Sequence, residues 1–477
     1  MRVKSFIKHG VEWCPVEIEL SFMPGLPQFQ FLGLPDTALK ESQWRIKTAL
    51  KKQGFEWPKG RQIIVNMRPS NIRKSSQGLE LAIACAFLWA TEQVQKSPLL
   101  PEIPWVYGEL SLEGDVIAPK DIYRAECELE SEVLLTGQSD EDFPFSTAQI
   151  ENLKSLETLY VNLSSGLEEK EEKKIPEVYF CKSAAQLLKV IATGEHNSLL
   201  VGPAGSGKTT VCEMISHLLK SSSQKDFREI KRWALMMNWP IQQRPFVMPH
   251  HSTPNISMIG GGSPPVPGEI TRANKGVLVL DELLEFSSVV KESLREPIVS
   301  GKISVSRRGI KKEFPADFLL LATSNLCPCG NLVPGKFNSC RFSLIRCRSY
   351  TEKLSGPLAD RFEILAFSHL WKSNQEVSLQ EIYESVRNAQ EFAKATRGQD
   401  MVNAKVPIKI IEDTMDPFLK SGGMPEISGS RRRYQAVMRV ARSFADLESS
   451  ECIRLKHIQL AIGYAVIPFA ELQEIFA

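Results

Sequence analysis

The sequence lacks several features that would place it in a special class of protein. No apolar run is long enough to span a bilayer, and the first twenty residues lack the apolar core of a signal peptide. An excess of one charge is also missing, since 58 lysines and arginines oppose 56 aspartates and glutamates, which leaves a formal net charge of +2. We therefore expect a cytoplasmic protein in which any binding of nucleic acid depends on local basic clusters.

The composition is otherwise that of an ordinary globular protein. Hydrophobic residues make up 43% of the chain and charged residues 24%. At 477 residues the chain is too long for a single core, so roughly two to four domains are expected. Six scattered cysteines are expected to be buried thiols in a reducing compartment: Cys14, Cys85, Cys127, Cys181, Cys212 and Cys452.

The patterns along the chain divide it into four parts. Residues 1–138 alternate short strand-like runs with amphipathic helical stretches, which predicts a mixed α/β domain. Residues 139–177 are polar and highly charged, which predicts an end segment and linker. Residues 178–370 contain SLLV, VLVL and FLLLAT, short apolar runs typical of strands in a parallel sheet. Residues 371–477 are largely helical.

The stretch GPAGSGKTT matches the phosphate-binding P-loop pattern. Its glycines let several backbone N–H groups point at one phosphate, Lys208 reaches the outer phosphates, and the Thr209 hydroxyl can hold Mg²⁺. The strand-like SLLV before it and the helix-like VCEMISHLL after it supply the expected context. The sequence thus predicts a site for ATP and Mg²⁺, formed by Gly202, Pro203, Ala204, Gly205, Ser206, Gly207, Lys208, Thr209 and Thr210.

Polar residues follow two of the apolar runs. VLVL ends in Asp281 and Glu282, of which Asp281 can hold Mg²⁺ through water and Glu282 can polarise the attacking water. FLLLATS is followed by Asn325, which could orient that water or simply cap a turn. Together these residues predict hydrolysis of the bound ATP.

Two arginines could contact the γ-phosphate. Arg361 follows a Gly-Pro turn and could reach the site of a neighbouring subunit as an arginine finger. Arg432 opens a C-terminal helix and could contact the phosphate in its own subunit. For both residues an ordinary surface arginine is the alternative.

These motifs, in this order, resemble the ComM/YifB family of AAA+ ATPases, a group similar to magnesium chelatase. The resemblance extends over nearly the whole chain, through RPFVMPHHSTPNISMIGGGSPPVPGEI, GVLVLDELLEF, LREPIVSGKISVSR, PADFLLLATSNLCPCG, KLSGPLADRFEI and VARSFADL. It implies a Lon-protease-like α+β N-terminal domain, then a P-loop AAA+ core with a parallel sheet, and a helical lid.

The resemblance also implies roles and assembly. It suggests a hexameric ring and a function like that of ComM, a DNA branch-migration helicase used in natural transformation. The implied roles are Walker A for Gly202–Thr209, Walker B for Asp281 and Glu282, sensor 1 for Asn325, arginine finger for Arg361 and sensor 2 for Arg432.

The stretch GKISVSRRGIKK predicts a β-hairpin with four cations, Arg307, Arg308, Lys311 and Lys312. In the AAA+ proteins that the chain resembles, a hairpin at this place faces the central pore. Cations there would neutralise DNA phosphates without reading bases, as a sequence-independent motor requires. A solvated basic hairpin without a ligand is the alternative.

Two further groups could suggest a metal. Cys327, Cys329, Cys340 and Cys347 stand within a short stretch and could hold Zn²⁺, with free thiols as the alternative. The family pattern has C-x-C in both halves, and Phe342 stands here in place of the fourth cysteine. His250 and His251 are adjacent and lack an i+4 partner. We therefore expect them to stabilise the inserted segment that surrounds them, between the P-loop and VLVL, rather than bind metal.

The Lon-like domain raises the question of proteolysis. Lon-type peptidases need a serine nucleophile and a lysine base, but the resemblance puts Gly78 at the nucleophile position and the lysine position near Tyr123. We expect no protease activity, although Ser75, Ser76 and Lys120 leave a shifted dyad open.

Three functions remain open at this point. The first is an ATP-driven motor on single-stranded or branched DNA. The second is a chelatase-like or chaperone-like ATPase that remodels a protein partner, although the sequence shows no metal-insertion or von Willebrand-type domain. The third is a ring that holds ATP without turnover, which Asp281 and Glu282 argue against.

Overall fold

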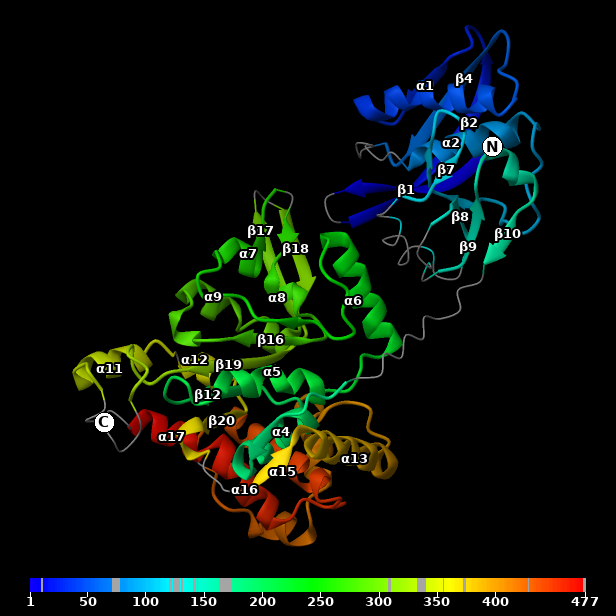
Figure 1. The fold of residues 1–477 in the computed structure, drawn as a ribbon. Coiled ribbons are helices and arrows are strands. Elements are labelled where there is room, and N and C mark those ends of the chain that lie inside the picture. The colour runs from blue at the N-terminus through cyan, green and yellow to red at the C-terminus, as the bar shows by residue number, and fades with distance from the viewer. Residues whose placement is uncertain are drawn as a thin grey trace. The chain divides into compact units, whose positions relative to one another are not determined.

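The computed structural model describes residues 1–477 except 10–11, 71–77, 120–121, 123–128, 130–131, 140–142, 144, 163–173, 264, 308–309, 333–339, 355, 372–374, 428 and 475–477. The chain forms two compact units (Figure 1), one of residues 1–170 and 231–241 and one of residues 171–230 and 242–477. No helix in the described part of the chain combines the length and apolar character needed to cross a bilayer.

The first unit is built on an eight-stranded mixed sheet of order β10-β9-β8-β5-β1-β2-β4-β3. Its long antiparallel pair is β1 with β2, and β2 also pairs with β4. The strands are β1 (Arg2–His9), β2 (Glu12–Pro24), β3 (Phe29–Leu32), β4 (Arg61–Arg68), β5 (Trp105–Val106), β8 (Leu134–Gly137), β9 (Thr147–Ile150) and β10 (Tyr160–Asn162).

Two helices of this unit differ in how much of their surface they bury. In α1 (Thr37–Lys52), Asp36 caps the N-terminus by accepting from Leu39 N, and one stripe of the helix is buried. In α2 (Leu79–Ala90), every residue from Leu79 to Trp89 is buried, so this helix is the centre of the core. A short hairpin on either side of Glu113 consists of β6 (Glu109–Leu110) and β7 (Val116–Ile117).

The first unit extends beyond the boundary that the sequence suggested at residue 138. The segment 147–162, expected to belong to a polar linker, forms β9, the 3₁₀ helix η2 (Leu153–Glu157) and β10, and continues the sheet from β8. Ala148 and Ile150 are buried there. These strands have four and three residues, so they are too short for their alternation to stand out among charged neighbours.

The second unit contains a five-stranded sheet of order β13-β16-β19-β12-β20, and all its pairs are parallel. The predicted parallel-sheet core is thereby confirmed. Its strands are β12 (Ser198–Val201), β13 (Phe246–Val247), β16 (Val277–Leu280), β19 (Leu319–Ser324) and β20 (Ile364–Phe367). Because parallel strands end at one edge of the sheet, the segments that follow β12, β16, β19 and β20 lie near one another.

Short elements decorate this core. They include α5 (Lys208–Leu218), the insert with α7 (Asn255–Ile259), β14 (Gly260–Gly261), β15 (Val266–Pro267) and α8 (Glu269–Arg272), then η3 (Leu283–Glu285), α9 (Ser288–Ser293) and α10 (Pro297–Ser300). Helix α6 (Gln224–Met237) begins in this unit, and its residues from 231 on are grouped with the first unit. The hairpin of β17 (Lys302–Arg307) and β18 (Ile310–Pro315) stands out from the sheet (Figure 1). Helices α11 (Leu344–Thr351) and α12 (Gly356–Ala359) follow β19.

The C-terminal helical region, residues 376–474, packs on α4 (Lys182–Gly194) and shares one continuous hydrophobic core with the sheet. In Figure 1, α4, α13 and α15 lie together, and α15 also contacts α16. The region comprises β21 (Glu376–Ser378), paired with β11 (Tyr179–Cys181), α13 (Leu379–Arg397), η6 (Asn403–Lys405), α14 (Ile408–Asp413), the π-helix η7 (Leu419–Gly423), α15 (Arg431–Leu447), α16 (Leu455–Ala465) and α17 (Ile467–Glu474).

The six scattered cysteines were expected to be buried, but only some of those in the described residues are. Cys85 and Cys212 are buried, Cys14 and Cys181 are partly exposed, and Cys452 is exposed. Cys127 lies outside the described residues.

Candidate active site

The predicted phosphate loop lies between the end of β12 at Val201 and the start of α5 at Lys208. Gly207 caps α5 with a φ of 84°, in the left-handed region that favours glycine. Gly202 is required for another reason, because a Cβ at that position would lie 2.1 Å from Ser368 Oγ at the end of β20. Ser206 Oγ also contacts Ser368 Oγ, at 2.5 Å, so Ser368 supports the loop from a distant part of the chain.

Lys208 is buried within this loop, with 7% of its surface exposed. Its Nζ donates to Gly202 O at 3.0 Å, Pro203 O at 2.7 Å and Asn325 Oδ1 at 3.2 Å. Burial lowers the pKa of Lys208, against the negative charges of Asp281 and Glu282, which raise it. The structure thus joins Lys208 and Asn325, two predicted site residues 117 positions apart.

Asp281, directly after β16, accepts hydrogen bonds from two hydroxyl groups. Thr209 Oγ1 donates at 3.1 Å and Thr323 Oγ1 at 2.5 Å, both to Asp281 Oδ1. Thr209 and Asp281 were predicted to share Mg²⁺, and these two oxygen donors do lie together. Oxygen atoms are the ligands that Mg²⁺ prefers, so the donor set fits the ion.

The sequence interpretation missed Thr323. Besides donating to Asp281, its Oγ1 accepts a hydrogen bond from Glu282 N at 3.0 Å, so one hydroxyl fixes both acidic residues. The available signal was a hydroxyl residue directly after the apolar run FLLLA, two positions before Asn325.

Glu282 adopts a left-handed backbone conformation, with φ 58° and ψ 51°, which is uncommon for a residue with a side chain. Strain of this kind typically costs about 1–3 kcal/mol and clusters at functional sites. His251 Nδ1 lies 3.7 Å from Glu282 Oε2, while the His250 and His251 rings are 4.1 Å apart. The adjacent histidines therefore structure the insert next to the predicted catalytic glutamate.

The two predicted phosphate-contacting arginines belong to one cationic group. Arg361 Nε donates to Arg295 O at 3.2 Å, and Arg361 also donates to Pro357 O. Burial lowers the pKa of Arg361, and the positive charges of Arg432 and Arg295 lower it further. Arg432 is exposed at the start of α15.

Arg433, which the sequence interpretation did not single out, is the buried member of the triplet in SGSRRRY. Its guanidinium donates to Phe362 O and Ala465 O, both at 3.0 Å, and stacks on Phe469 with 3.7 Å between Cζ and the ring centroid. Arg433 thus holds the segment that follows Arg361. Arg433 differs from Arg432 in being buried, and a run of three identical residues gives no sign of which one is buried.

The basic hairpin predicted from GKISVSRRGIKK is confirmed as β17–β18, with Ser306 opposite Lys311 and Val305 opposite Lys312. Ile303 and Val305 are buried. Lys311 is exposed, with Glu313 at 3.9 Å. Arg308 and the side chain of Arg307 lie outside the described part of the structure.

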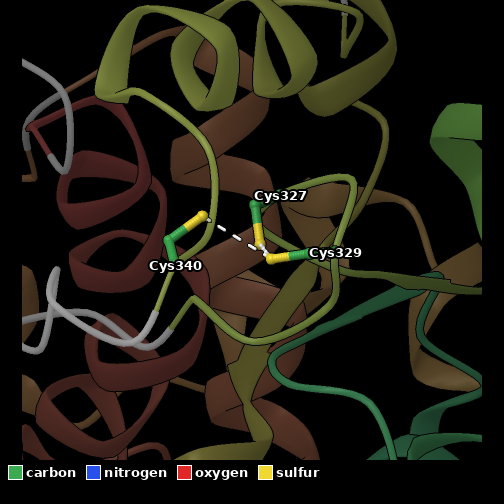
Figure 2. A group of neighbouring side chains, drawn as sticks. All are labelled: Cys327, Cys329 and Cys340. Atoms are coloured by element: carbon green, nitrogen blue, oxygen red, sulfur yellow. Dashed lines mark hydrogen bonds between the residues drawn. The ribbon is translucent and has the colours of Figure 1, made fainter.

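The four clustered cysteines come together. Figure 2 shows the sulfurs of Cys327, Cys329 and Cys340 turned toward one another, with Sγ–Sγ distances of 3.3 Å and 3.6 Å along the series. Cys347, on α11, lies 3.3 Å from Cys340. Tetrahedral zinc with Zn–S bonds of about 2.3 Å places sulfurs about 3.8 Å apart, and the sulfurs of Cys327, Cys329 and Cys340, all within 4.8 Å of one another, fit that spacing. Cys347 lies beside Cys340 but outside this group of three.

The thiols differ in acidity. Burial raises the pKa of Cys327 to about 11. Burial would also raise the pKa of Cys329, but the backbone N–H groups of Arg341 and Asn331 hold it at about 7. The loop also touches the phosphate loop, because Ala204 N donates to Gly330 O at 2.9 Å.

At the nucleophile position implied for a Lon-type peptidase, Gly78 packs against a buried ring. A Cβ there would lie 2.1 Å from Tyr107 Cζ, so no larger residue fits without rearrangement. Ser75, Ser76, Lys120 and Tyr123 lie outside the described residues.

Comparison with protein families gives three matches that together span most of the chain. The model described as "Magnesium chelatase, subunit ChlI" matches residues 175–375. "Subunit ChlI of Mg-chelatase" matches residues 16–133, and "Magnesium chelatase, subunit ChlI C-terminal" matches residues 376–465.

Comparison with known proteins gives relatives of similar length. The chain is 30% identical to the competence protein ComM of Haemophilus influenzae, over 95% of both chains. It is 31% identical to the protein YifB of Escherichia coli, described as uncharacterized, over 96% of this chain and 95% of that one. The magnesium-chelatase 38 kDa subunit of Chlorobaculum parvum is 27% identical over 41% of this chain and 53% of its own.

Proposed function

Because the chain belongs to the ComM/YifB family of magnesium-chelatase-like AAA+ ATPases, we propose that it is an ATP-driven motor that moves DNA. In this proposal it is a hexameric helicase or branch-migration translocase that serves natural transformation or recombination in the cytoplasm. The similarity to a protein named for competence, over nearly all of both chains, supports this choice.

The observation that carries the proposal is the convergence of Lys208, Thr209, Asp281 and Asn325 at one edge of the parallel sheet. Bound MgATP supplies the phosphoanhydride bond and the metal. The loop from Gly202 to Thr210 cradles the phosphates with its N–H groups, and Lys208 neutralises their charge. Asp281 and Thr209 would hold Mg²⁺. Glu282 would take a proton from the water that attacks the γ-phosphate as the bond to ADP breaks, and Asn325 would orient that water.

A ring would complete this site. The positive charges of Arg432 and Arg295 lower the pKa of Arg361, while Asp360 and Glu292 offset part of this repulsion, and the γ-phosphate would add a further anion. In our proposal the γ-phosphate of a neighbouring subunit meets Arg361, and the γ-phosphate of the same subunit meets Arg432. One subunit then stabilises the transition state in the next.

The basic hairpin would contact the DNA. We assign Arg307, Arg308, Lys311 and Lys312 to its phosphates, since the hairpin stands out from the sheet and Lys311 is exposed.

Two parts of the proposal concern structure rather than turnover. Zn²⁺ held by Cys327, Cys329, Cys340 and Cys347 would fix the loop that touches Ala204. The first unit would be a Lon-protease-like domain without peptidase activity, which the packing of Gly78 against Tyr107 supports.

The second candidate is an ATPase that remodels a protein partner. It is favoured by the partial match to a protein named as the 38 kDa subunit of a magnesium chelatase. The two candidates differ in what should stimulate ATP hydrolysis.

The deciding experiment measures ATP hydrolysis with and without single-stranded or branched DNA, and separation of a labelled strand. We expect DNA to stimulate hydrolysis and Lys208→Ala to abolish it. Absence of both stimulation and strand separation in an ATP-hydrolysing protein would refute the DNA motor and favour the second candidate.

A paired set of hairpin variants locates the DNA contact. Lys311→Glu, near the tip, should weaken DNA binding and reduce the salt slope of log K by about 1. Lys302→Glu, at the base of the same hairpin and similarly exposed, is the matched control and should change binding less. Equal loss in both variants would argue against tip-specific contact.

A further inference from the structure

Asp317 lies between the basic hairpin and β19, the strand that precedes Asn325. The hairpin ends with β18 at Pro315, and β19 starts at Leu319. Asp317 N donates to Asn274 Oδ1 at 2.9 Å, and Lys275 N donates to Asp317 O at 2.6 Å. Lys275 Nζ also donates to Asp317 Oδ2 at 3.0 Å. The base of the hairpin is thus fixed to the start of β16 through one residue.

The other oxygen of Asp317 is bound from the C-terminal helical region. Lys405 Nζ, in η6, donates to Asp317 Oδ1 at 2.6 Å. Burial alone would raise the pKa of Asp317, but Lys405 and Lys275 hold it below its ordinary value. The carboxylate therefore stays charged and bridges two parts of the second unit.

A hydrogen-bonded path leads from Lys405 to the helix that carries Arg432. Asn403, in the same turn as Lys405, is buried and donates to Ser443 Oγ at 3.0 Å and Asp446 Oδ2 at 2.9 Å. Both acceptors lie on α15, whose first turn contains Arg432 and Arg433. A helix of this length is a stiff rod of about 25 Å.

The Lys405–Asp317 pair lies at the wall of a cavity, beside the hydrophobic core that the helical region shares with the sheet. The cavity has a volume of about 750 Å³ and is lined by residues of both the sheet and the helical region. By contrast, Ser443 Oγ lies 2.8 Å from the buried His196 Nε2, which fixes that end of α15 close to β12. The Lys405–Asp317 contact is therefore more exposed to solvent than the buried contact between Ser443 and His196.

We propose that the Lys405–Asp317 ion pair couples the C-terminal helical region to the base of the basic hairpin, so that nucleotide binding repositions the hairpin. Lys405 and Asp317 are positioning residues, since neither contacts the candidate site. This inference rests on the proposed nucleotide-driven motor and names the connection through which the motor moves its hairpin.

The exposure of the pair suits a movable joint. The side chains of Lys405 and Asp317 are 44% and 31% exposed, so the pair is solvated and contributes little to stability. A contact of this kind can form and break within one ATP cycle, unlike a buried pair.

The test is amide hydrogen exchange of β17 and β18 in the full chain, with and without a non-hydrolysable ATP analogue. In the wild type the analogue should change exchange in the hairpin and protect residues 202–210. In Lys405→Gln the change in the hairpin should fall several-fold while protection of residues 202–210 stays. Lys405→Arg, which keeps the charge, should restore the response.

Lys394→Gln is the matched control, because Lys394 lines the same cavity but pairs with Asp400 within the helical region. It should behave as the wild type. A full hairpin response in Lys405→Gln, or a wild-type hairpin that ignores the analogue, would overturn the coupling. This readout uses no DNA, so a failure to stimulate hydrolysis with DNA would refute the DNA motor separately.

Discussion

The two edges of the five-stranded sheet hold their charges in different ways. At the carboxyl edge, Lys208 donates to carbonyl and amide oxygens, while Asp281 accepts from hydroxyl groups. At the amino edge, acids meet cations directly, as in the Glu195–Arg244 pair, with two N–O distances of 2.8 Å. Neutral partners at the first edge leave the charges available to phosphate and Mg²⁺, whereas the second edge neutralises its charges within the chain.

The largest effect is expected from removing the positive charge of Lys208 at the carboxyl edge. Lys208→Ala should lower the rate of ATP hydrolysis by at least about 100-fold, because it removes a cation placed for the transferred phosphate. The measurement is steady-state hydrolysis, with circular dichroism as the check on folding. A loss below tenfold would contradict the assignment.

At the amino edge the equivalent change should affect stability instead. Glu195→Gln leaves Arg244 partly buried without its carboxylate, which should cost about 3 kcal/mol of unfolding free energy. Chemical denaturation measures this. The double variant Glu195→Gln, Arg244→Met should recover part of the loss, and a single variant as stable as the wild type would show that the pair is not structural.

Two threonines sharpen the comparison further. Thr323→Val removes the hydroxyl that holds Asp281 and Glu282, and should lower hydrolysis about tenfold. Thr193→Val is its control at the amino edge, since Thr193 Oγ1 is buried and has no hydrogen-bond partner among the described residues. That variant should keep its activity and its thermal midpoint, or raise the midpoint slightly. Similar effects of the two changes on hydrolysis would speak against the role given to Thr323.

The smallest effect concerns pH. Burial alone would raise the pKa of Glu195, but Arg244 holds it below its ordinary value. A carboxylate with a depressed folded pKa contributes fully above its unfolded pKa, about 4.5, and loses that contribution as pH falls through the folded pKa. The difference in unfolding free energy between wild type and Glu195→Gln should therefore be constant from pH 7 to 5 and shrink below about 4.5. A difference that grows toward low pH would reverse this assignment.

What the sequence could predict were features set by neighbouring residues. Buried runs such as VLVL identified the parallel strands, and the P-loop pattern with its flanking context located Lys208 and Thr209. Thr323, Ser368 and Arg433 were missed because their roles depend on the register between strands and on which of several like residues is buried. The strands β9 and β10 were not foreseen within the polar end segment and linker expected at residues 139–177, since strands of three or four residues carry too little periodicity to detect.

The close approach of Ser368 to the phosphate loop limits which substitutions the glycines of that loop can tolerate. Gly202 is constrained by a neighbour in its own fold, whereas Gly205 and Gly207 have open space around the position of an added Cβ. A larger residue at Gly202 would therefore require Ser368 to move, whereas Gly205 and Gly207 are favoured by their left-handed φ values of 71° and 84°. The conformation of the phosphate loop thus depends on a residue that follows β20, far from the loop in sequence.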